Sequence, residues 1–197
     1  MSSENRTSVP NSLNEHWMPF TSNKDFKANP RLITEAKGVY LKTHHGKTQI
    51  DASSGLFCNP LGHGRKEITE AVTKQLDTLD YAQPFQQGFG GSFELASKIA
   101  KHTPGDLNKM FFTICGSTAV ETAIKIAVAY HRAKGDAQRF RFVGRERGYH
   151  GMNIGCVSVG GMVNNVKTFA SILMPGVQHI RHTHLPEHKF VSGQPET

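Results

Sequence analysis

The residues with the clearest chemical potential are Gly116 and Ser117, which stand between a short apolar run and a long amphipathic pattern. The run at 110–113 is typical of a buried strand, and the residues after Ser117 have helical spacing. A tight turn before a helix presents backbone N–H groups that have no partner within the helix, and the helix dipole favours negative charge there. Gly116 permits close approach and Ser117 adds a hydroxyl donor. The turn is therefore a candidate phosphate site.

A second candidate lies downstream, where Tyr149 and His150 stand between Gly148 and Gly151. An aromatic face on a glycine-flanked loop, combined with a phosphate turn, suggests a flat phosphorylated cofactor. Spacing alone leaves simpler alternatives open at both places. The first is an ordinary strand-to-helix turn, and the second is a half-buried aromatic residue beside a hydrogen-bonded histidine.

The elements around these two segments are expected to bring them together. The strand at 110–113, a helix that continues to about residue 134, and a strand at 139–143 form a βαβ pattern, which implies parallel strands and a right-handed crossover. Ligands of such sheets collect at the carboxyl ends of the strands. Because both candidate segments follow strand ends, we expect them at the same edge of the sheet.

The rest of the chain supplies further elements and indicates the α/β class. A hairpin is predicted at 38–51, and helices are predicted at 65–79 and from Ser92 to the Pro–Gly pair at 104–105. Residues 156–159 and 177–180 are weaker strand candidates.

Composition indicates a globular protein and argues against nucleic-acid binding. The chain has 197 residues, of which 37% are hydrophobic and 20% are charged, as in ordinary soluble globular proteins. The formal net charge is +7, but the positive residues are spread along the chain, and the one cluster, at 139–147, alternates as a strand does. Nucleic-acid binding is therefore not expected.

The cysteines and the hydropathy pattern indicate a cytoplasmic protein. No apolar run approaches the ~18 residues that span a bilayer, and the N-terminus is polar. Cys58, Cys115 and Cys156 are widely spaced and odd in number, which argues against a disulfide framework. We therefore expect a reducing compartment and no membrane segment.

Histidines near the C-terminus raise the question of a metal site. His179, His182, His184 and His188 lie close together, but their spacing matches no zinc pattern, and solvated loop histidines are the preferred interpretation. No metal site is predicted. Cys115 stands at a predicted helix start, where a thiol can be activated, but the sequence fixes no histidine or acid beside it.

An ordered series of segments carries a family resemblance. It includes HWMPFT at 16–21, DASSGL at 51–56 and GRERGYHG at 144–151. The remaining segments lie at 62–64, 79–82, 111–113, 116–117, 158–161, 173–177, 181–184 and 193–196. The chain resembles the N-terminal part of class III (omega) aminotransferases and is most similar to the β-alanine (omega-amino acid):pyruvate aminotransferases among them.

The resemblance implies a fold and a domain division. Members of this family are pyridoxal-phosphate enzymes of fold type I, a three-layer αβα architecture, here truncated and preceded by a small N-terminal β-hairpin segment. Residues 1–58 would form the N-terminal tail and a segment of the small domain. Residues 59–197 would form the first, incomplete part of the large cofactor-binding domain.

The resemblance also implies roles for particular residues. Gly116 and Ser117 would bind the cofactor phosphate, Tyr149 would stack on the pyridine ring, and His150 would lie beside that ring. The expected substrate-pocket residues are Phe20, Leu56, Phe57 and Phe85, the last of which would reach the pocket of a neighbouring subunit. From the sequence alone, Phe20, Phe57 and Phe85 fit a hydrophobic core better than a pocket, so their pocket role rests on the resemblance.

The chain departs from the family pattern at four positions. Phe57 stands where tryptophan is usual, which would make that pocket wall smaller. Ile114 and Cys115 stand where asparagine and serine are usual, and Thr118 stands where an acidic or small polar residue is common. The changes at the phosphate turn leave its backbone donors in place.

The implied activity is amino-group transfer from an omega-amino acid, such as β-alanine, or an amine to pyruvate or another keto acid, in a homodimer or tetramer. The Schiff-base lysine of the family is expected beyond Thr197, so no catalytic residue is assigned to this chain, and the chain alone is expected to be inactive.

Two alternatives remain: a non-catalytic fragment that pairs with another chain, and a phosphate- or nucleotide-binding module of another type. The turn lacks both common nucleotide-binding glycine patterns, which disfavours the second.

Overall fold

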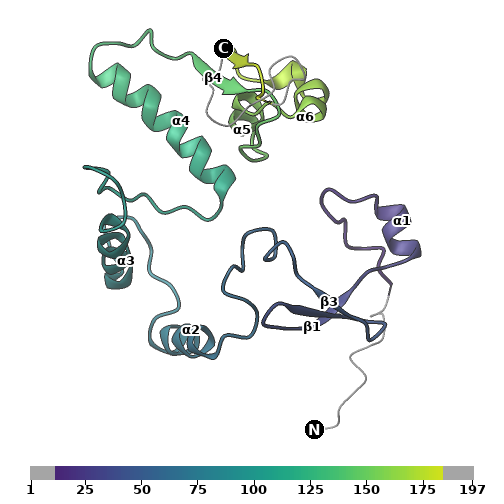
Figure 1. Cartoon of the computed structure of the whole chain (residues 1–197). Helices are drawn as coiled ribbons and strands as arrows, with labels where there is room; N and C mark the ends of the chain where they lie inside the picture. The colour runs from purple at the N-terminus through teal and green to yellow at the C-terminus, as the bar shows by residue number, and fades with distance from the viewer. Residues whose placement is uncertain (1–11, 184–197) are drawn as a thin grey trace, which may run out of the picture. The chain divides into compact units, whose positions relative to one another are not determined.

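The computed structural model describes residues 12–183 (Figure 1), and the chain divides into two compact units between Gly90 and Gly91. The domain boundary predicted between residues 58 and 59 stays a prediction. Within residues 12–183, no helix has the length and apolar character that crossing a membrane requires.

The first unit holds a small antiparallel sheet in the order β1 (Ile33–Lys37), β2 (Tyr40–Thr43) and β3 (Thr48–Ile50). It also contains α1 (Asn23–Ala28) and α2 (Lys66–Thr78). The hairpin predicted at 38–51 is confirmed, since β2 pairs with β3. The strand β1 was not expected, because its residues do not alternate clearly. Pairing with β2 stabilises it, through contacts such as Ala36 opposite Leu41.

Three helices follow the predicted helical patterns closely. They are α2, α3 (Gly90–Ala100) and α4 (Gly116–Ala133). The helix α3 ends four residues before the Pro–Gly pair that was expected to end it. Gly135 follows α4 with a φ of +87°, a left-handed conformation that glycine adopts without strain at a helix C-terminus.

Two strand predictions are wrong. Residues 110–113 form no strand, and the side chains of Phe111 and Phe112 are exposed. A strand needs a neighbour to satisfy its backbone groups, and no described strand pairs with this segment. The predicted βαβ unit that began there is therefore not formed. Residues 156–159 lie in a helix, α5 (Ile154–Val159), because a short buried apolar run does not distinguish helix from strand.

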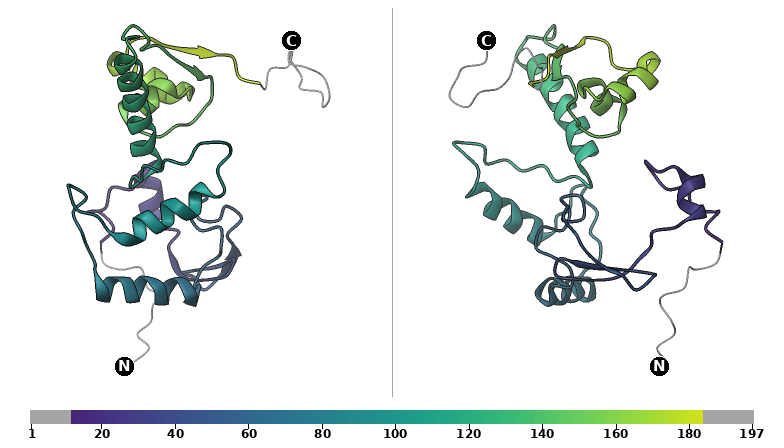
Figure 2. Two further views of the ribbon diagram at one scale, coloured as in Figure 1. Left: turned by 90° about the vertical axis from the view of Figure 1, so that its left-hand side faces the viewer. Right: turned by 45° about the vertical axis from the view of Figure 1, so that its right-hand side comes forward.

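The second unit is organised around one parallel pair, β4 (Phe142–Arg145) and β5 (Val177–Ile180). The strand predicted at 177–180 is thus confirmed, and the one predicted at 139–143 forms two to three residues later. The crossover between the strands contains α5, α6 (Val163–Thr168) and a 3-10 turn (Ala170–Ile172). The helix α5 contacts α4, α6 and both strands, and Figure 2 shows it beside the parallel pair from two further directions.

Glycines allow α5 and the segment after it to approach β4 very closely. A Cβ atom on Gly144 would collide with the carbonyl oxygen of Val159. A Cβ atom on Gly161 would collide with the carbonyl oxygen of Arg145 and would lie 2.5 Å from the Cα of Glu146. Real Cβ atoms do not tolerate such distances from backbone, so these positions exclude every other residue type unless the backbone moves.

We predict that Gly161→Ala lowers the free energy of unfolding by about 1–3 kcal/mol, because the added methyl group meets backbone rather than a movable side chain. The matched control is Gly90→Ala at the start of α3, where a Cβ meets nothing within 4 Å, and a change within about 0.5 kcal/mol is expected. Urea unfolding followed by circular dichroism measures both. Equal losses in the two variants would contradict the close-packing account.

Candidate cofactor site

The predicted phosphate turn lies at the N-terminus of α4. Cys115 precedes the helix in an extended conformation, and the first helical hydrogen bond of the α type runs from the N–H of Ala119 to the carbonyl of Cys115 at 3.0 Å. The N–H groups of Gly116, Ser117 and Thr118 therefore precede the helical ladder. Such groups, together with the helix dipole, favour an anion at this end of α4.

The predicted aromatic loop packs directly against this turn. The backbone N–H of Met152 donates to Oγ of Ser117 at 3.0 Å. A Cβ atom on Gly151 would lie 2.5 Å from the same Oγ and 2.9 Å from the Cα of Ser117, and Gly151 has a φ of +119°. Only glycine fits such a position. The structure thus brings together two segments that are more than thirty residues apart, as the sequence predicted.

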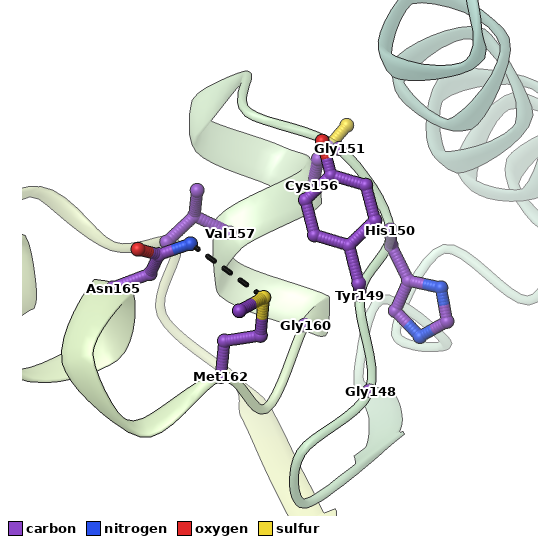
Figure 3. Close-up of a pocket in the computed structure, with 9 residues that line it drawn as sticks. All are labelled: Gly148, Tyr149, His150, Gly151, Cys156, Val157, Gly160, Met162 and Asn165. Carbon is purple, nitrogen blue, oxygen red and sulfur yellow. Dashed lines mark hydrogen bonds between the residues drawn. The ribbon is translucent and has the colours of Figure 1, made fainter. Parts of the chain in front are cut away.

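The loop that carries Tyr149 and His150 is fixed at the end of β4 by backbone hydrogen bonds to Gly161. The N–H of Arg147 donates to the carbonyl of Gly161 at 2.7 Å, and the N–H of Gly161 donates to the carbonyl of Gly148 at 2.9 Å. The loop lines a small cavity beside α5, and in Figure 3 the Tyr149 ring and the His150 imidazole leave it in different directions. The Tyr149 side chain is 59% exposed, which leaves its ring available to a ligand.

These groups suit a phosphorylated aromatic ligand. The Ser117 hydroxyl accepts the Met152 N–H, so its own hydrogen remains available to donate to a phosphate oxygen. Because Gly151 has no side chain, the loop can lie close to the start of α4. A phosphate at the N-terminus of α4 and a planar ring beside Tyr149 can therefore be held by neighbouring residues of one unit.

Cys115 shares donors with any anion bound at this turn. Its Sγ lies 3.3 Å from the hydroxyl oxygen of Thr118. That hydroxyl first, and then the backbone N–H groups of Thr118 and Ser117, lower the pKa of the Cys115 thiol, and these effects outweigh desolvation. A negative thiolate would compete with a phosphate for the same N–H groups.

The four predicted substrate-pocket residues, Phe20, Leu56, Phe57 and Phe85, belong to the first unit. Their exposed fractions lie between 74% and 85%, so the alternative that they fill a core does not hold in this structure. Phe20, Leu56 and Phe57 have φ angles of 50°, 57° and 68°. Left-handed backbone at non-glycine residues is strained and clusters at functional sites. Their roles in substrate binding stay predictions.

Asp51 anchors the turn that leads to Leu56 and Phe57, and the sequence analysis did not single it out. Its carboxylate accepts the backbone N–H groups of Ser53 and Gly55 at 3.2 and 2.8 Å and the Ser53 hydroxyl at 3.0 Å. It also lies 3.2 Å from Nε2 of His63, and its side chain is only 7% exposed. The spacing Asp-x-Ser-x-Gly is typical of a side chain that bonds the following backbone, and could have revealed this role.

These hydrogen bonds favour the ionised form of Asp51. The bond with His63 is the largest cause, and together with those from Ser53 and Gly55 it outweighs desolvation and holds the pKa of Asp51 below its ordinary value. A carboxylate of this kind stabilises the fold above its unfolded-state pKa, and its contribution is lost as the pH falls through the lower folded-state pKa.

Histidines form no metal site in the part of the chain that the structure describes. His179 lies on β5, and its Nε2 is 2.7 Å from the carbonyl oxygen of Gly160, so its interpretation as a solvated loop histidine is wrong. The parallel pairing of β5 with β4 holds it there. His184 and His188 lie outside the described residues.

We predict that Asp51→Ala lowers the melting temperature at about pH 7 and that the difference from the parent shrinks as the pH falls through the lowered pKa of Asp51, because the parent carboxylate is then protonated as well. The control is Asp77→Ala, which removes an exposed carboxylate of α2. Circular dichroism melts across this range measure both. A difference that stays constant with pH would show that the Asp51 charge does not hold the turn.

Comparison with known proteins identifies the family. The family model for Aminotransferase class-III matches residues 21–195. An omega-aminotransferase from Caulobacter vibrioides is 47% identical over 94% of this chain, and a beta-alanine–pyruvate aminotransferase from Pseudomonas aeruginosa is 46% identical over 94%. These alignments cover 42% and 41% of the two relatives, so the chain spans about two fifths of their length.

Solved structures agree. The crystal structure of a thermostable (S)-enantioselective omega-transaminase from Thermomicrobium roseum superposes with a TM-score of 0.81 and 31% identity, over 85% of this chain and 38% of that one. An adenosylmethionine-8-amino-7-oxononanoate aminotransferase from Methanocaldococcus jannaschii gives 0.81 and 35%, over 86% and 39%. The predicted fold is thus confirmed as part of the fold type I architecture of transaminases that use pyridoxal 5′-phosphate. The chain belongs to the class III aminotransferases.

Proposed function

We propose that the protein takes part in amino-group transfer from an omega-amino acid, such as β-alanine, or an amine to pyruvate or another keto acid. The observation that carries the proposal is the contact of Gly151 with Ser117, because it sets the Tyr149 loop against a helix N-terminus suited to a phosphate. The names of two relatives, omega-aminotransferase and beta-alanine–pyruvate aminotransferase, support the substrate class.

The residues of this chain bind and orient the cofactor in this proposal. The N–H groups at the start of α4 and the Ser117 hydroxyl hold the phosphate as a fixed pivot. Tyr149 covers one face of the ring and excludes water from it, and His150 lies beside the ring. Bound pyridoxal phosphate supplies the electron sink that the bond changes at the substrate's α- or ω-carbon require.

The residues of the first unit form part of the substrate pocket in the same proposal. Phe20, Leu56 and Phe57 present apolar surface to the carbon chain of the amino donor, and Phe85 reaches the site of a second copy in a homodimer or tetramer. The turn anchored by Asp51 fixes the Leu56 and Phe57 backbone. In this proposal the enzyme acts in the cytoplasm.

The activity is tested on the protein as isolated from its source, by its intact mass and by the alanine it forms from β-alanine and pyruvate. Alanine formation supports the proposal. A stable 21.7 kDa product that transaminates unaided contradicts the expectation that this chain alone is inactive. Absence of transfer with every amino donor, together with a partner chain that copurifies, favours the alternative that this chain is a non-catalytic pairing partner.

We predict that Ser117→Ala weakens binding of pyridoxal 5′-phosphate about tenfold, because it removes a charge-assisted hydrogen bond to the phosphate. Binding of pyridoxal, which lacks the phosphate, is expected to change far less, so the ratio of the two affinities separates a lost contact from general loosening. The control is Ser171→Ala in an exposed 3-10 turn. Spectroscopic titration gives the dissociation constants, and an unchanged ratio in Ser117→Ala would contradict the phosphate assignment.

A further inference from the structure

We propose that Glu121 is a positioning residue for the cofactor loop: its carboxylate ties the start of α5 to α4 and thereby holds the Tyr149 loop against the phosphate turn. The contacts of Glu121 with Gly155 support the positional role. Its consequence for the cofactor rests on the proposed function.

The carboxylate of Glu121 caps a helix to which it does not belong. Its Oε1 accepts the backbone N–H of Gly155 at 2.7 Å in a part-buried setting. Gly155 is the second residue of α5, so its N–H has no acceptor within that helix. The residue at the usual capping position, Asn153, makes no side-chain capping hydrogen bond. Glu121 therefore supplies from α4 the acceptor that the local sequence does not supply.

The contact is tight because Gly155 has no side chain. A Cβ atom at this position would lie 2.8 Å from Oε1 and 3.0 Å from the carboxyl carbon of Glu121. The carboxylate therefore rests directly on the backbone of α5. The Gly155 main chain itself is buried, which excludes water as a replacement acceptor while the helices stay together.

One face of α4 binds both ends of the segment from Met152 to Cys156, which joins the aromatic loop to α5. Ser117 and Glu121 are four residues apart and so lie on the same side of the helix. Ser117 receives the N–H of Met152 through its hydroxyl at 3.0 Å and the thiol of Cys156 through its carbonyl at 3.2 Å. Glu121 takes the N–H that lies between them, at Gly155.

Cys156 reports on this junction because it is fully buried beside it. Desolvation first, and then the negative charge of Glu121, raise the pKa of the Cys156 thiol. The thiol is therefore protected twice while α5 rests on α4, by burial and by its low thiolate fraction. Opening of the junction exposes it. Cys58, which is exposed, provides an internal reference in the same chain.

The test measures alkylation of each cysteine in the native chain by peptide mass spectrometry, together with titration of pyridoxal 5′-phosphate. In Glu121→Ala, Cys156 is expected to react about tenfold faster relative to Cys58, and the cofactor to bind several-fold more weakly. Glu121→Gln retains an oxygen acceptor and is expected to stay within about twofold of the parent. Glu70→Ala, on the exposed surface of α2, is the control and is expected to change neither quantity.

A second variant leaves the carboxylate in the chain. Gly155→Ala places a methyl group against the end of a flexible side chain, so it displaces the carboxylate without removing it. Faster labelling of Cys156 in this variant supports the proposal even where Glu121→Ala does not fold.

Unchanged Cys156 labelling in both Glu121→Ala and Gly155→Ala overturns the proposal. So does faster labelling in Glu121→Gln equal to that in Glu121→Ala, because the charge and not the hydrogen bond would then be responsible. If the parent chain binds no pyridoxal 5′-phosphate, the proposed function fails, and the labelling data still decide whether Glu121 holds the junction.

Discussion

The candidate site depends on the close contact between Gly151 and Ser117. Because Gly151 has no side chain, the loop that carries Tyr149 can lie against the first turn of α4. The Cα of Ser117 would lie 2.9 Å from any Cβ at that position, so the approach is available to glycine alone. The other close approaches in this unit follow the same physical logic. Gly144 and Gly161 let α5 and the segment after it reach the backbone of β4. The positions of the loop and of α5 in this unit are therefore set by backbone contacts more than by interdigitated side chains.

The elements that could be predicted from the sequence are those defined by their own residues. The helix α4 has apolar residues at helical spacing and a glycine after its end, so its limits follow from local chemistry. The strand β1 and the helix α5 have no such signature. β1 exists because β2 pairs with it, and the buried run at 156–159 suits either a helix or a strand. Residues 110–113 show the converse, since this strand-like sequence forms no strand and no strand within residues 12–183 pairs with it.

The candidate site divides in the same way. Ser117 and Tyr149 can be found from the sequence because a turn before a helix and an aromatic residue between glycines have recognisable chemistry, and the expected juxtaposition is present. Glu121 has no such mark. It is one glutamate on an amphipathic helix, and its importance depends on Gly155, thirty-four residues away. Asp51 is intermediate, since the turn it makes is local but its pairing with His63 is not.

The left-handed backbone at Leu56 and Phe57 limits how this turn can diversify. Branching at Cβ crowds such a conformation, so valine, isoleucine and threonine are poorly tolerated at both positions, whereas glycine, asparagine and unbranched or aromatic side chains are accommodated more easily. Substitutions at these two neighbouring residues can thus change the size of an unbranched side chain, but they cannot easily add a branch close to the main chain. Fewer residue types are therefore available at Leu56 and Phe57, both to natural variation and to designed variant libraries.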